Sequence, residues 1–515
     1  MKNNKNGISL IVLVITIIVM IILAASVVIT LSNTGIINKA NDATYETELK
    51  QIQTLASLAW SDAYTAKMTD STINIEEEVK LALERQGIAR DKYIMDVSET
   101  GVVISAYTKD GTIKATTISG QLPLSLNSSA GVKLDNYKIY GNSIQNGIPS
   151  PVTPIEIQSV GVKTNNLFNK SDTPIYRNNN SMVVEETRAG IKFTNPAISS
   201  QGPYIANVYA IDSVENIGKN TIYISADVKI SGIPQVLIIL GYCDENGENR
   251  TTVKHLYIKE DGQYTTSMDV EPEKYAGKQI AVWLYSIACP SEVTLDAGTS
   301  VEYSNIMLSI GENEYEPYGY RIPVKVSNNT DEIVTNIYLD EPLRKIGDYA
   351  DYIDFENKKV VRKIAAKIFD GTETIYDIST GTYRYTYYVL GNDGAVTNDI
   401  CLSTHFTHQA DFSYTRPGNN MFRVYNSPSA FQTRIGFRFY LDGTIINDTT
   451  AVKKLLKDYY NQGNPVIMYY AHANGLETVE PVDLPNISTV KGNATLTVID
   501  TITPSKVELT YKEIK

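Results

Sequence analysis

Four carboxylates crowd into one short stretch of this sequence, and they are Asp348, Asp351, Asp354 and Glu356. Hydrolysis of a glycosidic bond needs two carboxyl groups roughly 5–10 Å apart across a cleft, so a glycan-hydrolase site is one interpretation. The same stretch also predicts a β-hairpin, with strands at 352–356 and 359–363 around Asn357 and Lys358. In that hairpin the acidic side chains face basic ones on the opposite strand. We favour the hairpin and predict no catalytic residue.

Two short passages have some features of metal sites. The first contains His405, His408 and Asp411, a spacing that could hold a metal ion on a helix, but the segment favours a strand or a loop. The second, at 244–249, carries oxygen ligands in a glycine turn but lacks the full spacing and the distant bidentate acid of a calcium loop. A plain hairpin turn is favoured there. We predict no metal and no cofactor.

Three aromatic residues are candidates for a sugar-binding platform, and they are Tyr242, Trp283 and Tyr285. Aromatic rings on a sheet face or a loop rim can stack on sugar rings. Trp283 lies in a strand pattern where tryptophan more often belongs to the core, so a packing role competes with the platform. The chain has 35 tyrosines against 10 phenylalanines, which suits half-exposed β surfaces because tyrosine combines an apolar ring with a polar tip.

Length, charge and cysteine content limit the classes of protein to which this chain can belong. The chain has 515 residues, too many for one ordinary core, so several domains are expected. Its net charge is -12, from 46 Lys plus Arg against 58 Asp plus Glu. A general nucleic-acid binder needs a basic surface, so we predict no nucleic-acid partner. Of the three cysteines, Cys243, Cys289 and Cys401, the first two either form a bridge or stay as free buried thiols.

An uninterrupted apolar run occupies residues 8–31, and no charge occurs between Lys5 and Lys39. As a helix rising ~1.5 Å per residue, the run would span ~36 Å, enough to cross a bilayer core of ~30 Å. Lys2 and Lys5 precede the run, so the positive-inside rule places the short N-terminus in the cytoplasm and the body outside. We expect a cell-membrane protein with an extracellular body.

The helical pattern continues after the apolar run. Apolar residues recur at steps of four and three, and they are Tyr45, Leu49, Ile52, Ala56, Ala59, Ala63 and Ala66. This pattern predicts one apolar stripe on a long amphipathic helix. No proline occurs before Pro123, so a near-continuous transmembrane and amphipathic helix is predicted over 8–66. The stripe either joins helices of neighbouring subunits or packs on a small sheet of the same chain.

The residues Gly7-Ile8-Ser9-Leu10-Ile11, after a short lysine-containing leader, resemble the processing site of type IV prepilins. In that family a prepilin peptidase cuts after the glycine, and the new N-terminus is methylated. The resemblance implies a leader at 1–7, with Gly7 before the cut and Ile8 as the mature N-terminus. The family usually has Glu at the fifth mature position, where this chain has Val12, which favours a minor subunit. An uncleaved anchor and a secretory signal cut near Ala25 are the alternatives.

A small α+β domain is predicted at 67–122. Asn74 could cap a helix over 75–86, with Glu77 completing a capping box and Gly87 ending the helix. Strands are predicted at 93–97, 102–107 and 112–118. A long helix packed by a short helix and a small antiparallel sheet is the arrangement of pilins, which the first 120 or so residues resemble.

Strand patterns and turn signals recur after residue 123, with clear examples at 221–230, 235–242, 279–287 and 301–310. They predict mainly β jelly-roll or sandwich domains, so the fold class is α+β and multidomain. We assign 123–165 to a linker and the first strands of the outer body, 166–320 to a jelly-roll domain, and 321–515 to a β-rich C-terminal region with a helix near 449–461.

Three passages, at 155–169, 305–319 and 338–364, resemble tail-associated, host-facing structural proteins of phages and prophages from Gram-positive bacteria. In that group the central portion looks like a carbohydrate-binding jelly roll. The resemblance therefore implies a carbohydrate-binding domain at 166–320 and a tail-fibre-like C-terminal region.

These features favour a non-enzymatic, membrane-anchored, pilin-like surface protein that displays a tail-fibre-like β module for adhesion or glycan recognition. The expected partners are the membrane, prepilin peptidase, other pilin subunits and surface glycans. A membrane-anchored glycan hydrolase and a purely structural surface spacer are the alternatives. The β module from about Asn136 to Lys515 is expected to fold without the first 120 residues.

Overall fold

The computed structural model describes residues 38–515 except for 99, 109–112, 127–131, 170–173, 178–181, 187–189, 202–203, 245–246, 329–331, 379–383, 392–400, 410–416, 428–431, 473–476, 483–493 and 515. The predicted processing site at Gly7 and Ile8, Val12 and the apolar run at 8–31 lie outside the described residues. Among the helices that are described, none is both long and apolar enough to cross a membrane. The chain divides into two compact units, Met1–Lys114 with Ile514–Lys515, and Ala115–Glu513.

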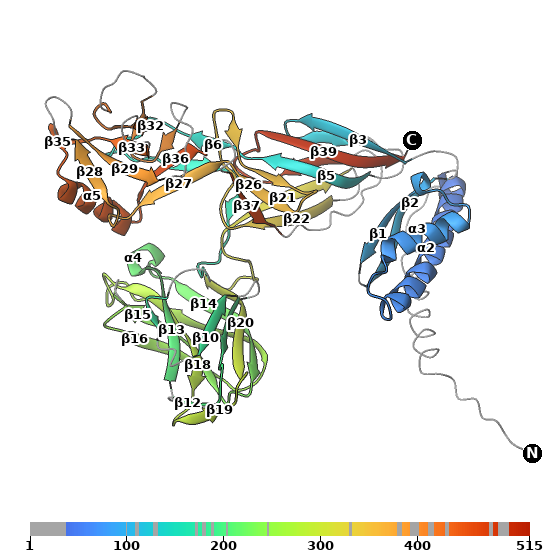
Figure 1. Cartoon of the computed structure of the whole chain (residues 1–515), viewed down its shortest axis with the longest axis horizontal. Helices are drawn as coiled ribbons and strands as arrows, with labels where there is room; N and C mark the ends of the chain where they lie inside the picture. The colour runs from blue at the N-terminus through green and yellow to red at the C-terminus, as the bar shows by residue number, and fades with distance from the viewer. Residues whose placement is uncertain are drawn as a thin grey trace, which may run out of the picture. The chain divides into compact units, whose positions relative to one another are not determined.

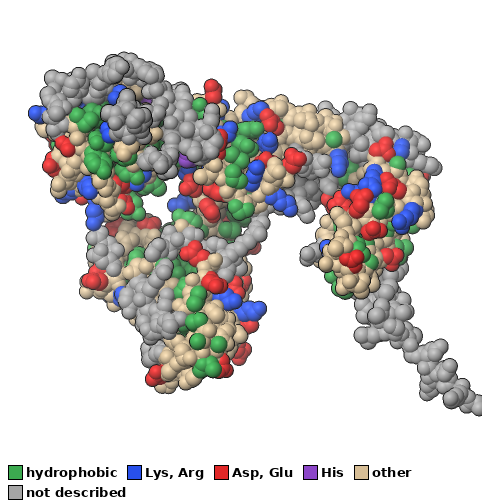
Figure 2. Space-filling model, viewed as in Figure 1, with side chains coloured by type: hydrophobic (Ala, Val, Ile, Leu, Met, Phe, Trp, Pro, Cys, Tyr) green, Lys and Arg blue, Asp and Glu red, His purple; other side chains and the backbone are tan. Residues whose placement is uncertain are grey.

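The first unit packs two helices against a two-stranded antiparallel sheet (Figure 1). Its elements are α2 (Asn38–Lys67), α3 (Ile75–Arg85), the 3-10 helix η1 (Arg90–Lys92), β1 (Tyr93–Ser98) and β2 (Gly101–Tyr107). Asn74 caps α3 as predicted, because its side chain accepts a hydrogen bond from the backbone N–H of Glu77 at 3.2 Å. The Glu77 carboxylate pairs with Arg90 at 2.6 Å instead of closing a capping box. Figure 2 shows acidic and basic side chains intermixed on the outer face of this unit.

The apolar stripe of α2 packs inside the first unit. Ile52, Ala56 and Ala63 are buried in one cluster with residues of α3 and of both strands, which are Ile75, Val79, Leu83, Tyr93, Val102 and Ile104. The small alanines leave room for α3 and β2 to lie close to α2. Packing on a sheet of the same chain, one of the two expectations for the stripe, is therefore confirmed for these residues.

The polar side chain of Gln53 also ties α2 to the sheet. The Gln53 amide donates to the backbone carbonyl of Val102 at 2.8 Å and accepts from the backbone N–H of Ile104 at 2.6 Å. We expect Gln53→Ala to lower the free energy of unfolding of this unit by about 1–3 kcal/mol, because both backbone groups lose their partner. Thermal or urea unfolding measures the change. Thr54→Ala, on the exposed side of the same turn, is the matched control and should shift stability by less than about 0.5 kcal/mol; equal effects of the two variants would contradict the assigned role.

The second unit contains a β-sandwich of two five-stranded antiparallel sheets (Figure 1). The first sheet has the order β10 (Val183–Glu186), β11 (Gly190–Thr194), β20 (Ser300–Ile310), β14 (Thr221–Ser231) and β17 (Gly262–Asp269). The second has the order β16 (Thr251–Ile258), β15 (Val236–Cys243), β18 (Gln279–Ala288), β13 (Tyr204–Ser213) and β9 (Tyr176–Arg177). A pair, β12 (Ser199–Gln201) with β19 (Val293–Leu295), and the short helix α4 (Val214–Ile217) accompany them. The expected mainly β fold with sandwich domains is confirmed here.

Side-chain alternation explains how the sandwich forms its core. Along β14, buried and half-buried residues alternate from Thr221 to Val228, so one face packs inward and the other lies outside. All eight residues of β15 are buried, because both faces of this central strand are covered. The buried hydroxyl of Tyr303 donates to the backbone carbonyl of Tyr285 at 2.5 Å and links the two sheets.

Two further sheets bring together residues from opposite ends of the chain. The larger sheet has the order β3 (Ile113–Gly120), β39 (Lys506–Ile514), β5 (Val132–Tyr140), β25 (Tyr352–Asp354), β26 (Lys359–Arg362) and β37 (Thr478–Pro481). The other has the order β22 (Glu332–Leu339), β21 (Tyr320–Ser327), β38 (Ala494–Val498) and β4 (Leu124–Leu126), and β8 (Val162–Lys163) also pairs with β21. A fragment beginning at Asn136 would cut through β5 and remove β3 and β4. The natural start of an isolated β module is therefore Ala115.

The two largest of the remaining sheets share an aromatic core. One has the order β28 (Ile375–Ile378), β29 (Tyr385–Gly391), β33 (Gln432–Phe437), β32 (Met421–Ser427) and β31 (Thr407–His408). Another has the order β27 (Ile364–Phe369), β36 (Val466–Ala471) and β30 (Leu402–Ser403). Three two-stranded pairs are β34 (Phe439–Leu441) with β35 (Thr444–Ile446), β6 (Ser143–Gln145) with β7 (Ile157–Ser159), and β23 (Lys345–Ile346) with β24 (Tyr349–Ala350). Helix α5 (Thr449–Asn461) lies where a helix was expected and buries Val452 and Leu456.

Candidate functional site

The three aromatic residues predicted as a sugar platform do not lie on one face of the sandwich. Tyr242 of β15 belongs to the cluster between the two sheets, whereas Trp283 of β18 belongs to a cluster on the opposite face of its sheet. Tyr285 packs beside Trp283 and is half-buried. The register explains the separation, because Tyr242 lies opposite Ile280 while Trp283 lies opposite Ile239, and successive residues alternate between faces.

Burial also removes two of these rings from contact with a ligand. Tyr242 is 1% exposed and Trp283 is 3% exposed. A ring that is covered on both faces cannot stack on a sugar, so the structure does not form the predicted platform. Trp283 has the core role that its strand pattern favoured. Cys243 and Cys289 are free and buried, and burial raises the pKa of the Cys243 thiol to about 11.

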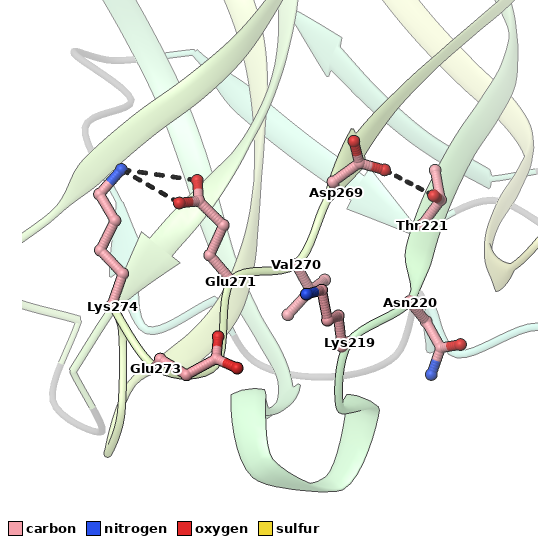
Figure 3. Close-up of a pocket in the computed structure, with 8 residues that line it drawn as sticks. All are labelled: Lys219, Asn220, Thr221, Asp269, Val270, Glu271, Glu273 and Lys274. Atoms are coloured by element: carbon pink, nitrogen blue, oxygen red, sulfur yellow. Dashed lines mark hydrogen bonds and ion pairs between the residues drawn. The ribbon is translucent and has the colours of Figure 1, made fainter.

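An open, polar pocket of about 520 Å³ lies at one end of the sandwich, where β14 begins and β17 ends (Figure 3). Its lining residues are Lys219, Asn220, Thr221, Asp269, Val270, Glu271, Glu273 and Lys274. Composition alone could not identify this pocket, because its two walls are 50 residues apart in the sequence. The local signal is a run of charged residues directly after the strand at 262–269.

Hydrogen bonds fix both walls of the pocket. The hydroxyl of Thr221 donates to the Asp269 carboxylate at 2.5 Å, and the backbone N–H of Val270 donates to the carbonyl of Asn220 at 2.9 Å. The Lys274 ammonium lies 3.5 Å from the Glu271 carboxylate. In Figure 3 the Glu271 and Lys274 side chains point toward each other on one side, and Asp269 and Thr221 meet on the other.

Tyr242 supports the pocket from inside the sandwich. Its ring stacks on the ring of Tyr275, with centroids 3.8 Å apart. Its hydroxyl accepts from the backbone N–H of Glu271 at 3.3 Å and donates to the carbonyl of Asp269 at 3.4 Å. Burial raises the pKa of Tyr242, so the hydroxyl keeps its proton. Tyr242 therefore positions the backbone of the pocket wall without reaching the pocket itself.

The pocket offers both hydrogen-bond acceptors and donors to a polar ligand. Asp269, Glu271 and Glu273 supply carboxylate oxygens, Asn220 supplies a side-chain amide, and Lys219 supplies an ammonium group. All of these side chains are exposed. Such a set suits the hydroxyl groups of a sugar, each of which can donate and accept.

The predicted hairpin is present, and two of the four clustered carboxylates, Asp354 and Glu356, belong to it. β25 and β26 pair antiparallel with Asp354 directly opposite Lys359, and Lys358 in the turn has φ +49°. Asp354 accepts from the backbone N–H of Asn357 at 3.2 Å and from its amide at 2.9 Å. These hydrogen bonds lower the pKa of Asp354 against the opposing effect of burial. Asp348 and Glu356 are exposed in turns.

Asp351 is fully buried and is occupied by the backbone. Its carboxylate accepts hydrogen bonds from the N–H groups of Lys363 (2.7 Å), Ile364 (2.9 Å) and Arg344 (3.0 Å). The Arg362 guanidinium lies 3.7 Å away. Burial raises the pKa of Asp351, while Arg362 and the backbone donors oppose that shift. No route brings a substrate to this carboxylate, because its exposed fraction is 0%.

A second, shallower cavity of about 180 Å³ contains two members of that carboxylate cluster. Asp354 and Glu356 line it together with Glu508, Lys138 and others. Glu508 accepts a hydrogen bond from the hydroxyl of Tyr140 at 3.0 Å, and bonding to Lys506 lowers the pKa of the Glu508 carboxyl. A glycosidase needs one carboxylic acid with a raised pKa. Neither Asp354 nor Glu508 meets that need.

The HxxH passage forms part of the aromatic core. His405 is fully buried, its Nδ1 lies 2.8 Å from the Thr404 hydroxyl, and its ring meets that of Tyr459 edge-on. Burial lowers the pKa of His405 to about 4 and also lowers that of His408, which packs on Phe422. Asp411 lies outside the described residues. In the described part of the chain, no group of three His, Cys, Asp or Glu side chains could hold a metal ion.

The passage at 244–249 closes the turn between β15 and β16, as expected for a hairpin. The Asp244 carboxylate accepts from the backbone N–H of Glu248 at 2.6 Å and from the Asn249 amide at 2.9 Å. Gly247 and Asn249 have positive φ, which a tight turn requires. The oxygen atoms of Asp244 are thus used within the turn.

Comparison with known proteins gives similarities only to solved structures. No family model and no curated protein matches the chain. It is similar to the carbohydrate-binding module TmCBM61 in complex with β-1,4-galactotriose, with 12% identity over 26% of this chain and 86% of that one and a TM-score of 0.16. It is also similar to the CBM22-1–CBM22-2 tandem of Paenibacillus barcinonensis Xyn10C (8% identity, 69% and 98% coverage, TM-score 0.18) and to the PBSX exported protein XepA (10%, 71% and 99%, 0.15). The ligand of the pocket must therefore be inferred from the residues of this chain.

Proposed function

We propose that this chain is a non-enzymatic, membrane-anchored, pilin-like surface protein whose β unit recognises glycans. The observation that carries the recognition step is the open polar pocket at 219–221 and 269–274. Its exposed carboxylates, amide and ammonium groups can pair with several sugar hydroxyls at once. The residues that line the pocket include no aromatic ring to stack on a sugar, so affinity for a single site is weak. Several copies on one cell would increase avidity without new contacts.

The N-terminal part supports display at the cell surface. The leader-like residues before Ile8 and the apolar run at 8–31 resemble a prepilin, and α2 packs on α3 and the small sheet in the manner of a pilin. Membrane, prepilin peptidase and other pilin subunits are the partners in this proposal. With Val12 in place of the usual glutamate, the chain serves as a minor subunit wherever it enters a pilus.

The proposal of a non-enzymatic role rests on what the carboxylates do. Asp351 and Asp354 bind backbone groups, so neither is available for acid–base chemistry. The likeness of the passages at 155–169, 305–319 and 338–364 to host-facing tail proteins fits surface recognition rather than hydrolysis. A spacer role remains the outcome of the test below if no glycan binds.

A glycan array tests the pocket directly. We expect full-length protein, purified in a detergent without a sugar headgroup, to bind a subset of glycans. Asp269→Asn should weaken that binding about tenfold, because this lining carboxylate is a hydrogen-bond acceptor and loses its charge. Glu260→Gln is the matched control, because Glu260 is exposed in the turn at the other end of β17.

Three outcomes would contradict the proposal. A folded protein that binds no glycan favours the spacer, and binding that Asp269→Asn leaves unchanged removes the pocket from the site. Release of sugar products that is lost on mutation of Asp354, with the fold intact, favours the hydrolase.

A further inference from the structure

One face of the sheet made by β28, β29, β33 and β32 carries tyrosines and arginines. The residues alternating with them on these strands, among them Phe422, Ile435 and Phe437, point into the aromatic core. The side chains of the other face are Tyr376, Tyr385, Tyr387, Arg423, Tyr425 and Arg434. We call these six residues the tyrosine–arginine face. The sequence signal for it is the alternation in 385–389 and 423–425, which composition does not reveal.

Rings and guanidinium groups stack across this face. Tyr376 and Tyr387 stack with centroids 5.2 Å apart and 18° between their planes. The Arg434 guanidinium lies 4.4 Å from the Tyr387 ring, and that of Arg423 lies 4.4 Å from the Tyr425 ring. Such contacts hold each planar guanidinium in place over a ring and so prepare its N–H groups for a ligand.

Gly436 is buried beneath two of the rings, which pack closely over its backbone. A side chain at this position would lie 3.1 Å from Tyr425 and 3.3 Å from Tyr385. The hydroxyls of these two tyrosines are 3.2 Å apart. Burial raises the pKa of Tyr425 well above its ordinary value, so the Tyr425 hydroxyl keeps its proton. Tyr376, at the rim, is 45% exposed and is accessible to solvent.

The positive charges of this face have no counter-charge among the described residues. No described carboxylate forms an ion pair with Arg423 or Arg434, and the buried Nε of each has no hydrogen-bond partner. Two more deeply buried arginines elsewhere in the unit do have carboxylate partners: Arg344 pairs with Glu341, and Arg362 pairs with Asp351 and Glu480. Two guanidinium groups without a carboxylate partner in the described part of the chain give this face a local positive charge, although the net charge of the chain is -12.

We propose that the tyrosine–arginine face binds an acidic saccharide through its carboxylate. The guanidinium of Arg434 or Arg423 would take the carboxylate in a bidentate pair, and a neighbouring tyrosine would stack on the sugar ring. Charge complementarity selects this ligand, because a neutral sugar would leave both cations unpaired. The site lies on a different sheet from the pocket at 219–221 and 269–274, so it does not depend on the proposed function of that pocket.

Calorimetric titration with trigalacturonate tests the site, with neutral galactotriose as the matched ligand. Full-length protein in a detergent without a sugar headgroup is used at 50 and 500 mM salt. Trigalacturonate should bind at least about tenfold more tightly than galactotriose and lose affinity at high salt. Arg434→Gln should weaken binding about tenfold, and Arg434→Lys should restore part of it, since lysine keeps the charge without the planar fork.

Control variants distinguish a loss of binding at this face from unfolding of the protein and from a change in the pocket at 219–221 and 269–274. Tyr376→Ala should weaken binding about fivefold without unfolding the protein, because Tyr376 is at the exposed rim. Lys454→Gln removes an exposed positive charge from α5 and should have no effect, and neither should Asp269→Asn. The proposal is overturned if the acidic and neutral ligands bind equally, if neither binds, or if folded Arg434→Gln and Tyr376→Ala proteins keep the original affinity.

Discussion

Replacing Asp351 with alanine is expected to lower the free energy of unfolding by about 3–5 kcal/mol, because it removes the acceptor of three backbone donors and one of the two carboxylates beside the buried Arg362. The Asp351 carboxylate accepts from Lys363, Ile364 and Arg344 at 2.7–3.0 Å, where no water can substitute. Arg362, whose side chain is 4% exposed, keeps its ion pair with Glu480 at 3.3 Å, so most of the loss comes from the three backbone donors. Urea unfolding followed by tyrosine fluorescence measures the loss.

The Asp351→Asn variant removes the negative charge of the side chain but keeps its shape, so it separates the two contributions to stability. If its amide oxygen faces Lys363 and Ile364, its NH₂ group meets the backbone N–H of Arg344, and two donors then oppose each other. We expect this variant to be destabilised as well, though less than alanine. Asp348→Ala is the matched control, since Asp348 is exposed in the β23–β24 turn and should change stability by less than about 0.5 kcal/mol. A fully stable Asp351→Ala protein would contradict the structural role and reopen the hydrolase alternative.

Local sequence signals are sufficient to predict the elements whose hydrogen bonds join residues close together in the sequence. The hairpin of β25 and β26 follows from alternating residues and a turn at Asn357-Lys358, and α3 follows from its Asn74 cap. Likewise the turn at 244–249 needs only Asp244 and two positive-φ residues. In each case the hydrogen bonds join residues a few positions apart, so the pattern contains the whole interaction.

Long-range pairing is not contained in such patterns. The pairing of β39 with β3 and β5 joins residues more than 360 positions apart, and many other strand partners fit the same alternation. Trp283 and Tyr242 show that the sequence pattern is also insufficient to predict the candidate site. Each lies in an apolar strand of a sheet covered on both faces, so alternation alone cannot tell a surface ring from a core ring. The pocket depends on Asn220 and Asp269 becoming neighbours only after β14 pairs with β17.

A substitution at Gly7 is expected to block processing of the chain completely. The prepilin-like site places glycine directly before the cut, and a peptidase pocket that accepts glycine has no room for a branched side chain. Gly7→Val should therefore keep the leader, so the protein from membranes should carry residues 1–7 and lack N-terminal methylation. Intact-mass measurement of protein from the native host reads both changes at once.

The matched control is Asn4→Ala, which alters the leader away from the cut and should leave processing intact. Native protein that begins at Ile8 with a methyl group, together with a Gly7→Val protein that begins at Met1, would establish the prepilin-type site. Native protein that begins at Met1 would instead identify an uncleaved anchor. A start near residue 26 would identify a secretory signal, and in that case the body would be released from the membrane, since the apolar run that holds it would be cut.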